Sequence, residues 1–146
     1  MKNLMMIGLC LGLAGCQPEV AEVPYNLSLE MKQFMNHVLE PAADVVWDSA
    51  GYIVTMDGET SLAPTNDEEW AAVKAAGAMI VESGNMLMLP ERSPDADWQE
   101  FAVAMSTVGL QVMAAADAQD DDAVFQTGAT LYSVCVACHQ IHAPGL

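Results

Sequence analysis

Basic side chains are scarce in this chain of 146 residues, which has four Lys and Arg against twenty Asp and Glu and a formal charge of −16. A surface of this kind repels phosphate backbones and anionic headgroups, so we expect no nucleic-acid partner. The acidity either keeps the protein soluble or provides a docking surface for a basic partner. The length predicts one domain.

Patterns typical of enzyme sites are also lacking. The sequence contains no catalytic triad, no glycine-rich phosphate loop and no constellation of paired carboxylates. We therefore do not expect an enzyme. Histidine and cysteine are rare, with three and four copies, but two of each fall in the final segment C135-V-A-C-H-Q-I-H-A-P-G-L146.

The chain opens M1-K-N-L-M-M-I-G-L-C-L-G-L-A-G-C16, with one Lys, an apolar run and then small residues, which is the layout of a secretory signal. The apolar run is too short to span a bilayer. The stretch L13-A-G-C16 resembles the lipobox of bacterial lipoproteins, which implies cleavage before Cys16 and lipidation of that cysteine. The alternative is ordinary secretory cleavage with Cys16 as a bystander.

We therefore expect a signal peptide at residues 1–15, a tether at 16–26 and a folded domain at 27–146. Two prolines and two acidic residues between Gln17 and Asn26 are typical of a tether. The lipoprotein resemblance implies a periplasmic protein that contacts a membrane only through its lipid anchor. Gln17, in place of Asp, favours the outer membrane by resemblance to known sorting rules.

Four helical patterns and no credible pair of strands predict an all-α fold. The first pattern covers residues 28–49, with Ser28 as its cap and Pro41 as a kink or interruption. The second begins after Asn66, the third opens at Ser93 and Pro94, and the fourth begins at Asp120 and ends at Pro144 and Gly145. Residues 51–64, with their glycines and proline, indicate a loop.

Apolar spacings of three, four and seven give each helix one buried face. On the first helix the expected face is Leu27, Met31, Phe34, Val38 and Val45, and on the fourth it is Val124, Gly128, Leu131, Cys135, Cys138 and His142. Four such helices with short connections predict an antiparallel four-helix bundle, a fold that commonly houses a cofactor between facing helices.

The segment C135-V-A-C-H139 is a C-x-x-C-H motif, the attachment signature of c-type haem. On a helix, Cys135, Cys138 and His139 share a face, so two thiols can bond to the haem vinyl groups while the imidazole ligates the iron. Two alternatives are a zinc site that includes His142 and a thioredoxin-like dithiol. The first lacks a second cysteine pair and the second lacks a strand-turn-helix setting.

Two longer stretches resemble the class II cytochromes c, comprising the cytochromes c prime and their low-spin relatives. D97-W-Q-E-F-A-V-A-M-S-T-V-G-L-Q-V-M-A-A-A116 resembles their third helix, and G128-A-T-L-Y-S-V-C-V-A-C-H139 resembles their haem helix. The resemblance implies a four-helix bundle with one covalent haem c near the C-terminus, and many relatives form homodimers. His142 and Ala143 depart from the family, which usually has an aromatic and then a basic residue there.

The resemblance also places the sixth position of the iron against the first helix. Met35 is the expected distal ligand, and Met31, one turn earlier, is the alternative if the alignment slips by a turn. Both methionines could instead fill the core. His37 should face solvent, because it lies roughly opposite Met35.

Three functions follow from these expectations. A six-coordinate iron with a methionine ligand makes an electron carrier whose partners are other redox proteins with basic docking surfaces. A five-coordinate iron makes a protein that binds nitric oxide or carbon monoxide. In the third case the haem only holds a lipid-tethered fold together. We favour electron transfer.

Overall fold

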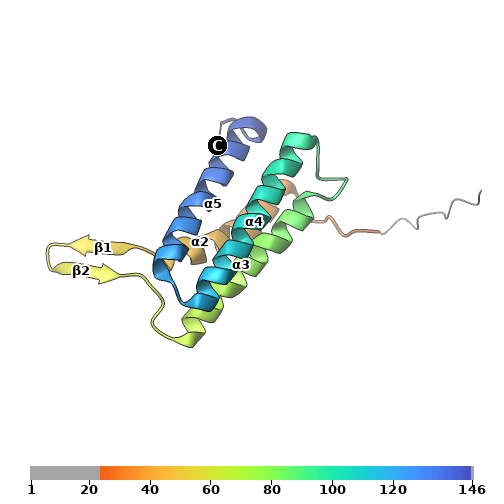
Figure 1. Ribbon diagram of the computed structural model, residues 1–146. Coiled ribbons are helices and arrows are strands. Elements are labelled where there is room, and N and C mark those ends of the chain that lie inside the picture. The colour runs from red at the N-terminus through yellow and green to blue at the C-terminus, as the bar shows by residue number, and fades with distance from the viewer. Residues whose placement is uncertain (1–23, 146) are drawn as a thin grey trace, which may run out of the picture.

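The computed structural model describes residues 24–145, and it is predominantly helical with one small antiparallel sheet (Figure 1). The expected signal peptide, Cys16 and most of the expected tether lie outside the described residues. The elements in chain order are α1 (Met31–Phe34), η1 (Met35–Leu39), α2 (Glu40–Asp48), β1 (Tyr52–Thr55), β2 (Gly58–Ser61), α3 (Asp67–Leu87), α4 (Ala96–Ala118) and α5 (Asp121–His142).

The first helical segment is continuous through α1, η1 and α2, and Pro41 does not interrupt it. Pro41 has no N–H and its ring crowds the carbonyl four residues back, which an ordinary α-helix cannot absorb without distortion. Here the helix widens into one π-turn, in which the N–H of Glu40 donates to the carbonyl of Met35, five residues earlier. Such single π-turns occur frequently at functional sites.

This π-turn overturns part of the expected buried face. A π-turn adds one residue to the turn, so every later side chain is displaced around the helix axis. Val45 is therefore exposed and its neighbour Val46 is fully buried. The sequence spacing predicted the reverse, because it assumed an uninterrupted α-helical period.

One of the three predicted helix caps is confirmed, at Asn66, and so is the predicted start of the fourth helix at Asp120. The side chain of Asn66 accepts a hydrogen bond from the N–H of Glu69, and that of Asp120 accepts one from Ala123. The other two predictions are wrong. Glu30 rather than Ser28 caps the first helix, through a reciprocal pair of hydrogen bonds with Gln33. Asp95 rather than Ser93 caps α4, because its carboxylate accepts from the N–H of Trp98.

The prediction of a loop with no strand pair at residues 51–64 is also wrong. Strands β1 and β2 form a hairpin whose two-residue turn lies between Thr55 and Gly58. The turn residues are Met56 and Asp57, and Gly58 begins β2, so the Asp-Gly pair typical of a hairpin is one position away from the centre of the turn. All side chains of both strands are exposed, and Figure 1 shows the hairpin standing away from the helices.

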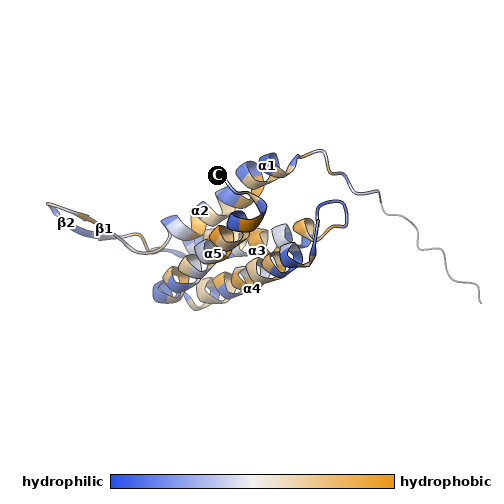
Figure 2. Ribbon diagram, turned by 90° about the horizontal axis from the view of Figure 1, so that it is seen from above, coloured by the Kyte–Doolittle hydropathy of each residue, from blue (hydrophilic) through white to orange (hydrophobic). Residues whose placement is uncertain are grey.

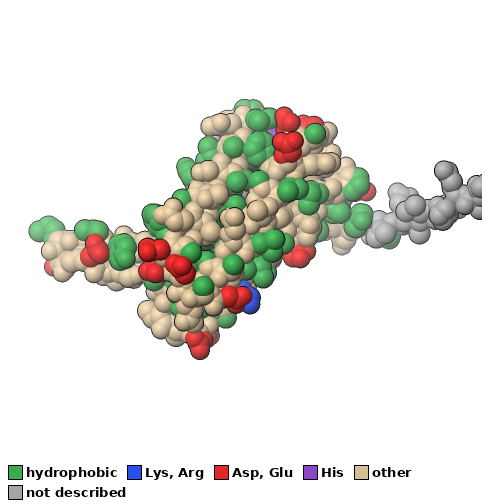
Figure 3. All heavy atoms as spheres, in the orientation of Figure 1, with side chains coloured by type: hydrophobic (Ala, Val, Ile, Leu, Met, Phe, Trp, Pro, Cys, Tyr) green, Lys and Arg blue, Asp and Glu red, His purple; other side chains and the backbone are tan. Residues whose placement is uncertain are grey.

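Helix α4 packs against both α3 and α5, and α2 contacts α3 and α5 on the other side of a shared interior (Figure 2). The largest fully buried side chains in it are Ile80, Leu131, Val46, Val73, Val112 and Val124. Helix α4 is long and apolar enough to cross a membrane by length and composition alone, as some core helices are. On the face shown in Figure 3, acidic and apolar side chains far outnumber Lys and Arg.

Candidate functional site

The last helix presents its three motif residues to one cavity. Cys135, Cys138 and His139 lie on α5 and line a cavity of about 40 Å³ inside the helical body, which we call the central cavity. Its other walls are almost entirely apolar. They are formed by Met35 and Leu39 from η1, Leu87 from α3, Trp98, Phe101, Ala102 and Met105 from α4, and Val134 from α5.

Residue spacing explains why the three groups meet. Positions 135, 138 and 139 are separated by three and four residues, so they project from the same side of an α-helix. That side continues the buried stripe of Val124, Gly128 and Leu131. The predicted inward face of α5 is confirmed, and its fourth and fifth turns carry thiols and an imidazole in place of aliphatic side chains.

Both thiols are free, and the surroundings favour their protonated form. Burial raises the pKa of the Cys135 thiol, and the neighbouring Cys138 raises it further. Burial also raises the pKa of Cys138, with a smaller contribution from the negative charge of Asp95. The central cavity is therefore a low-dielectric environment with a carboxylate close to one of its thiols.

The two methionines of the first helix occupy different places. Met35 is the first residue of the π-turn and lines the central cavity, so its thioether and the imidazole of His139 belong to one site. Met31 lines a separate hollow at the end of the helical body, with Trp98 as a shared wall. His37 is exposed, as the helical period predicts.

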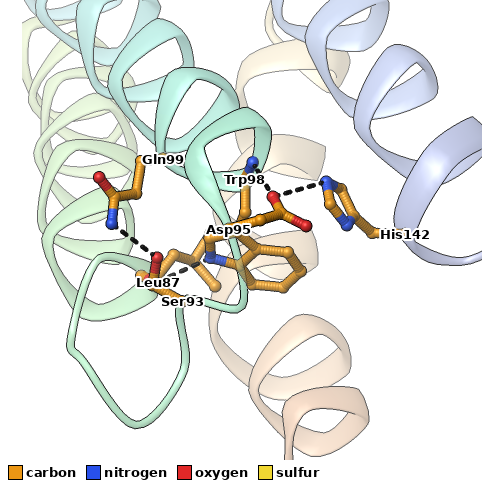
Figure 4. Close-up of polar contacts among 6 residues, drawn as sticks. All are labelled: Leu87, Ser93, Asp95, Trp98, Gln99 and His142. Atoms are coloured by element: carbon orange, nitrogen blue, oxygen red, sulfur yellow. Dashed lines mark hydrogen bonds and ion pairs between the residues drawn. The ribbon is translucent and has the colours of Figure 1, made fainter.

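A second cluster, which sequence reasoning did not foresee as a unit, lies at the end of α5 around Trp98 (Figure 4). The His142 ring packs edge-on against Trp98, with ring centroids 5.2 Å apart, and against Phe101 at 6.2 Å. Its Nε2 atom is buried and lies 3.9 Å from Oδ1 of Asp95. The indole N–H of Trp98 donates to the carbonyl of Leu87 at 2.8 Å.

The consequence of this cluster is that α5 is held to the start of α4. Asp95 caps α4 and faces His142, while Trp98 connects α4 to the end of α3. Asp after Pro94 is a favourable cap residue, so the local sequence is compatible with the cap. Nothing in the local sequence indicated that this cap faces a histidine from the far end of the chain.

The residues around the central cavity have the chemistry that a c-type haem requires. Two thiols and an imidazole share one helix face, a thioether faces them from η1, and the walls are apolar. Ligand sites for cofactors usually measure about 300–1,000 Å³. With 40 Å³ enclosed here, a haem would need α5 and η1 to stand farther apart than they do in this structure.

Among residues 24–145, no group of three or more His, Cys, Asp or Glu side chains is placed to hold a metal ion. Trp70 is buried, and Trp47 is half-buried and donates its indole N–H to the carbonyl of Gly128 at 3.0 Å. These two tryptophans have packing roles outside the central cavity, whereas Trp98 is part of its wall.

Comparison with known proteins adds no further constraint. No protein-family model matches the sequence, and no match was found among the curated proteins or the solved structures.

Proposed function

We propose that this protein is an electron carrier with one covalently bound haem c, held in an antiparallel four-helix bundle. The observation that carries the proposal is that Cys135, Cys138 and His139 line the same apolar cavity as Met35. The C-x-x-C-H order is the attachment signature of c-type haem, and here all of its reactive groups line one largely apolar cavity.

Each residue has a definite part in this proposal. Cys135 and Cys138 hold the cofactor by thioether bonds, which replace two thiols that the cavity keeps protonated. His139 is the proximal ligand and Met35 the distal one. The haem supplies the Fe(III)/Fe(II) couple, and the thioether and apolar walls favour a higher potential than a second imidazole would give.

The apolar walls of the central cavity suit electron transfer better than chemistry on a substrate. Trp98, Phe101 and Met105 form an apolar wall on α4, and Leu39 and Leu87 form apolar walls on η1 and α3. A methionine sulfur on the sixth position would leave no open coordination site for a gas. Redox partners with basic surfaces would complement the acidic exterior, and the charge of −16 supports that choice of partner.

The lipoprotein resemblance places this carrier in the periplasm, anchored through Cys16 to a membrane, with the outer membrane favoured. The folded domain then begins only about ten residues beyond the anchor. A tether of that length and composition keeps the domain near the membrane surface without embedding it. Dimer formation, as in many proteins of the resembling family, is part of the same proposal.

Covalent attachment is the decisive test. The protein is produced with a haem c maturation system and extracted with acidified organic solvent, which removes a non-covalent haem and leaves thioether-bound haem in place. We expect haem to remain with the unmodified protein and to be absent from the Cys135→Ala, Cys138→Ala double variant. Thr130→Ala, an exposed position on the same helix, is the matched control and should retain its haem.

Carbon monoxide separates electron transfer from the gas-binding alternative. A six-coordinate Fe(II) with a methionine ligand binds carbon monoxide slowly or not at all, whereas a five-coordinate iron binds it readily. A low-spin spectrum that is unchanged by carbon monoxide supports the electron carrier. A high-spin spectrum with rapid carbon monoxide binding would replace it by a gas-binding protein.

A further inference from the structure

Arg92 is a half-buried cation whose guanidinium is only partly satisfied. It lies in the connection between α3 and α4, where its Nη2 donates to the backbone carbonyl of Leu29 at 3.0 Å. Its Cζ atom lies 4.9 Å from the centre of the Phe34 ring, within the range of a cation–π contact. Its Nη1 atom is buried and has no hydrogen-bond partner among the described residues.

No carboxylate of the described residues neutralises this cation. The two ion pairs found in residues 24–145 are Lys74 with Asp117 and His142 with Asp95, and Arg92 belongs to neither. Glu30 and Glu91 line the hollow at the end of the helical body with Arg92. Glu82 lines a second hollow that Arg92 also lines, which we call the side hollow, and none of the three carboxylates pairs with Arg92. A buried donor without a partner is costly, and more so when it carries charge.

The position of Arg92 connects it to the candidate site. The end hollow is lined by Arg92, Met31, Ser93 and Trp98, among others. Trp98 is also a wall of the central cavity, and Met31 precedes Met35 by one helical turn. Trp98 is therefore a shared wall, and the central cavity adjoins the hollow that Arg92 lines.

We propose that Arg92 binds a carboxylate of the cofactor, a haem propionate, through its guanidinium. This inference rests on the proposed function. A guanidinium presents parallel N–H groups that match a carboxylate, and Nη1 is the donor that still lacks an acceptor. The pairing gives the propionate a countercharge in a chain where acidic residues outnumber basic ones by five to one.

The other cations of the described residues are less suited to this role. Lys74 is exposed and already paired with Asp117 at 2.7 Å, and Lys32 is exposed on α1. Neither lines the central cavity or the end hollow. Arg92 also lines the side hollow, together with Ser83, whose Oγ is buried and unpartnered. A free carboxylate in that hollow is the other ligand that could accept a hydrogen bond from Arg92.

The test measures the reduction potential of the haem-loaded protein as a function of pH. An ionised propionate stabilises Fe(III), so the potential falls as pH rises through the propionate pKa. An opposite charge within about 4–6 Å lowers a carboxyl pKa by about 1–3 units, which places this fall at low pH in the unmodified protein. In Arg92→Gln the fall should move to higher pH by about the same amount, at least a tenfold change in proton affinity.

Arg92→Lys, Lys74→Gln and added acetate are the controls for the effect of Arg92→Gln on the potential. Arg92→Lys keeps a point charge and should restore part of the shift, and it remains informative if Arg92→Gln does not mature. Lys74→Gln removes an exposed cation far from both hollows and should leave the curve unchanged. Added acetate should also change nothing, because a propionate of a covalently bound haem is always present at the site.

The outcomes distinguish this inference from the proposed function. If Arg92→Gln carries covalent haem and follows the same curve as the unmodified protein, the pairing is wrong while the haem assignment stands. A shift that appears only with added acetate would mean that Arg92 binds a free carboxylate, which also overturns the inference. Absence of covalent haem from the unmodified protein would overturn both proposals.

Discussion

Met35 and His139 line the same cavity, one from the first helix of the domain and the other from the last turns of its final helix. The π-turn that begins at Met35 is a local consequence of Pro41, which removes a backbone donor and crowds the preceding turn. The same proline therefore determines both how the first helix bends and which face of it meets α5.

Replacing Met35 by Ala should have an effect that replacing Met31 does not. If Met35 supplies the sixth ligand, Met35→Ala should convert a low-spin spectrum to high spin, lower the potential and allow carbon monoxide to bind. Met31 lines the end hollow, so Met31→Ala should mainly weaken packing. Loss of a fully buried methionine costs about 2–5 kcal/mol, and the half-buried Met31 should lie at the low end of that range.

Absorption spectra of the two variants, with and without carbon monoxide, show which of the two methionines ligates the iron. Thermal unfolding of each variant reports the packing cost separately. A spin change produced by Met31→Ala alone would show that the helical register assigned to the distal ligand is wrong by one turn.

Several features of the fold and of the candidate site are predictable from the sequence. Local spacing predicts the motif at Cys135, Cys138 and His139 and the inward face of α5, and local residue types predict the Asn66 cap and the start of α5 at Asp120. The structure agrees on the geometry of each. Local rules are reliable here because an uninterrupted helix repeats its geometry from turn to turn.

The errors occur where the chain departs from that repeat. Val45 and Val46 exchange their expected environments because one π-turn intervenes. The hairpin was missed because its strands are short and fully exposed, so they lack the alternation of buried and exposed residues that identifies a strand. The contact between Asp95 and His142 joins distant segments, which no local pattern can indicate.

The two thiols should be poor nucleophiles in the haem-free protein. Burial raises the pKa of both Cys135 and Cys138, so less thiolate is present at a given pH than for an exposed cysteine. Alkylation by iodoacetamide near pH 8 should therefore be slower in the folded protein than after unfolding in urea. Equal rates in the two states would contradict the burial of these thiols.

The same shifts predict how the stability of the haem-free protein depends on pH. A thiol whose pKa is higher in the folded state favours folding while it stays protonated, and this contribution is complete below the unfolded-state pKa. The stability should therefore decrease as pH rises above the ordinary thiol range toward the raised values. Urea unfolding at a series of alkaline pH values measures it, with the Cys135→Ala, Cys138→Ala variant as the control that lacks this dependence.

Asp95→Asn should lower the pKa of the Cys138 thiol and leave the pKa of the Cys135 thiol unchanged. The Asp95 charge contributes to the raised pKa of Cys138 but not to that of Cys135. Asn is an equally good helix cap, so the hydrogen bond to Trp98 can be retained while the charge is removed. Alkylation of Cys138 should become faster at alkaline pH, and the rate at Cys135 serves as the internal control. Mass spectrometry of the two modified peptides measures both rates, and an equal acceleration would indicate a general loosening of α5.

Cys16 should determine where the protein is found in the cell. If the segment L13-A-G-C16 directs lipidation, Cys16→Ser should either appear in the soluble periplasmic fraction or keep its signal peptide. The unmodified protein should remain with the membrane fraction and carry an acylated N-terminal cysteine. Mass spectrometry of the mature N-terminus provides the measurement, and a different, unlipidated N-terminus would remove the anchor from the proposal.

Adding a methyl group at Gly77 should destabilise the protein, although Ala is the better helix former by about 1 kcal/mol. A Cβ at Gly77 would lie 2.9 Å from both the carbonyl oxygen of Gly109 and the side chain of Met113, so α3 and α4 would have to separate. Overpacking of this kind costs about 1–3 kcal/mol, which at its upper end exceeds the propensity gain. Gly109→Ala meets the Gly77 carbonyl at 2.8 Å and should behave alike. Gly128→Ala should cost less, because its nearest neighbour is a Trp47 ring atom at 3.3 Å. Urea unfolding of the three variants ranks them. If Gly77→Ala proves more stable than the parent, the close crossing of α3 and α4 is not as the structure describes.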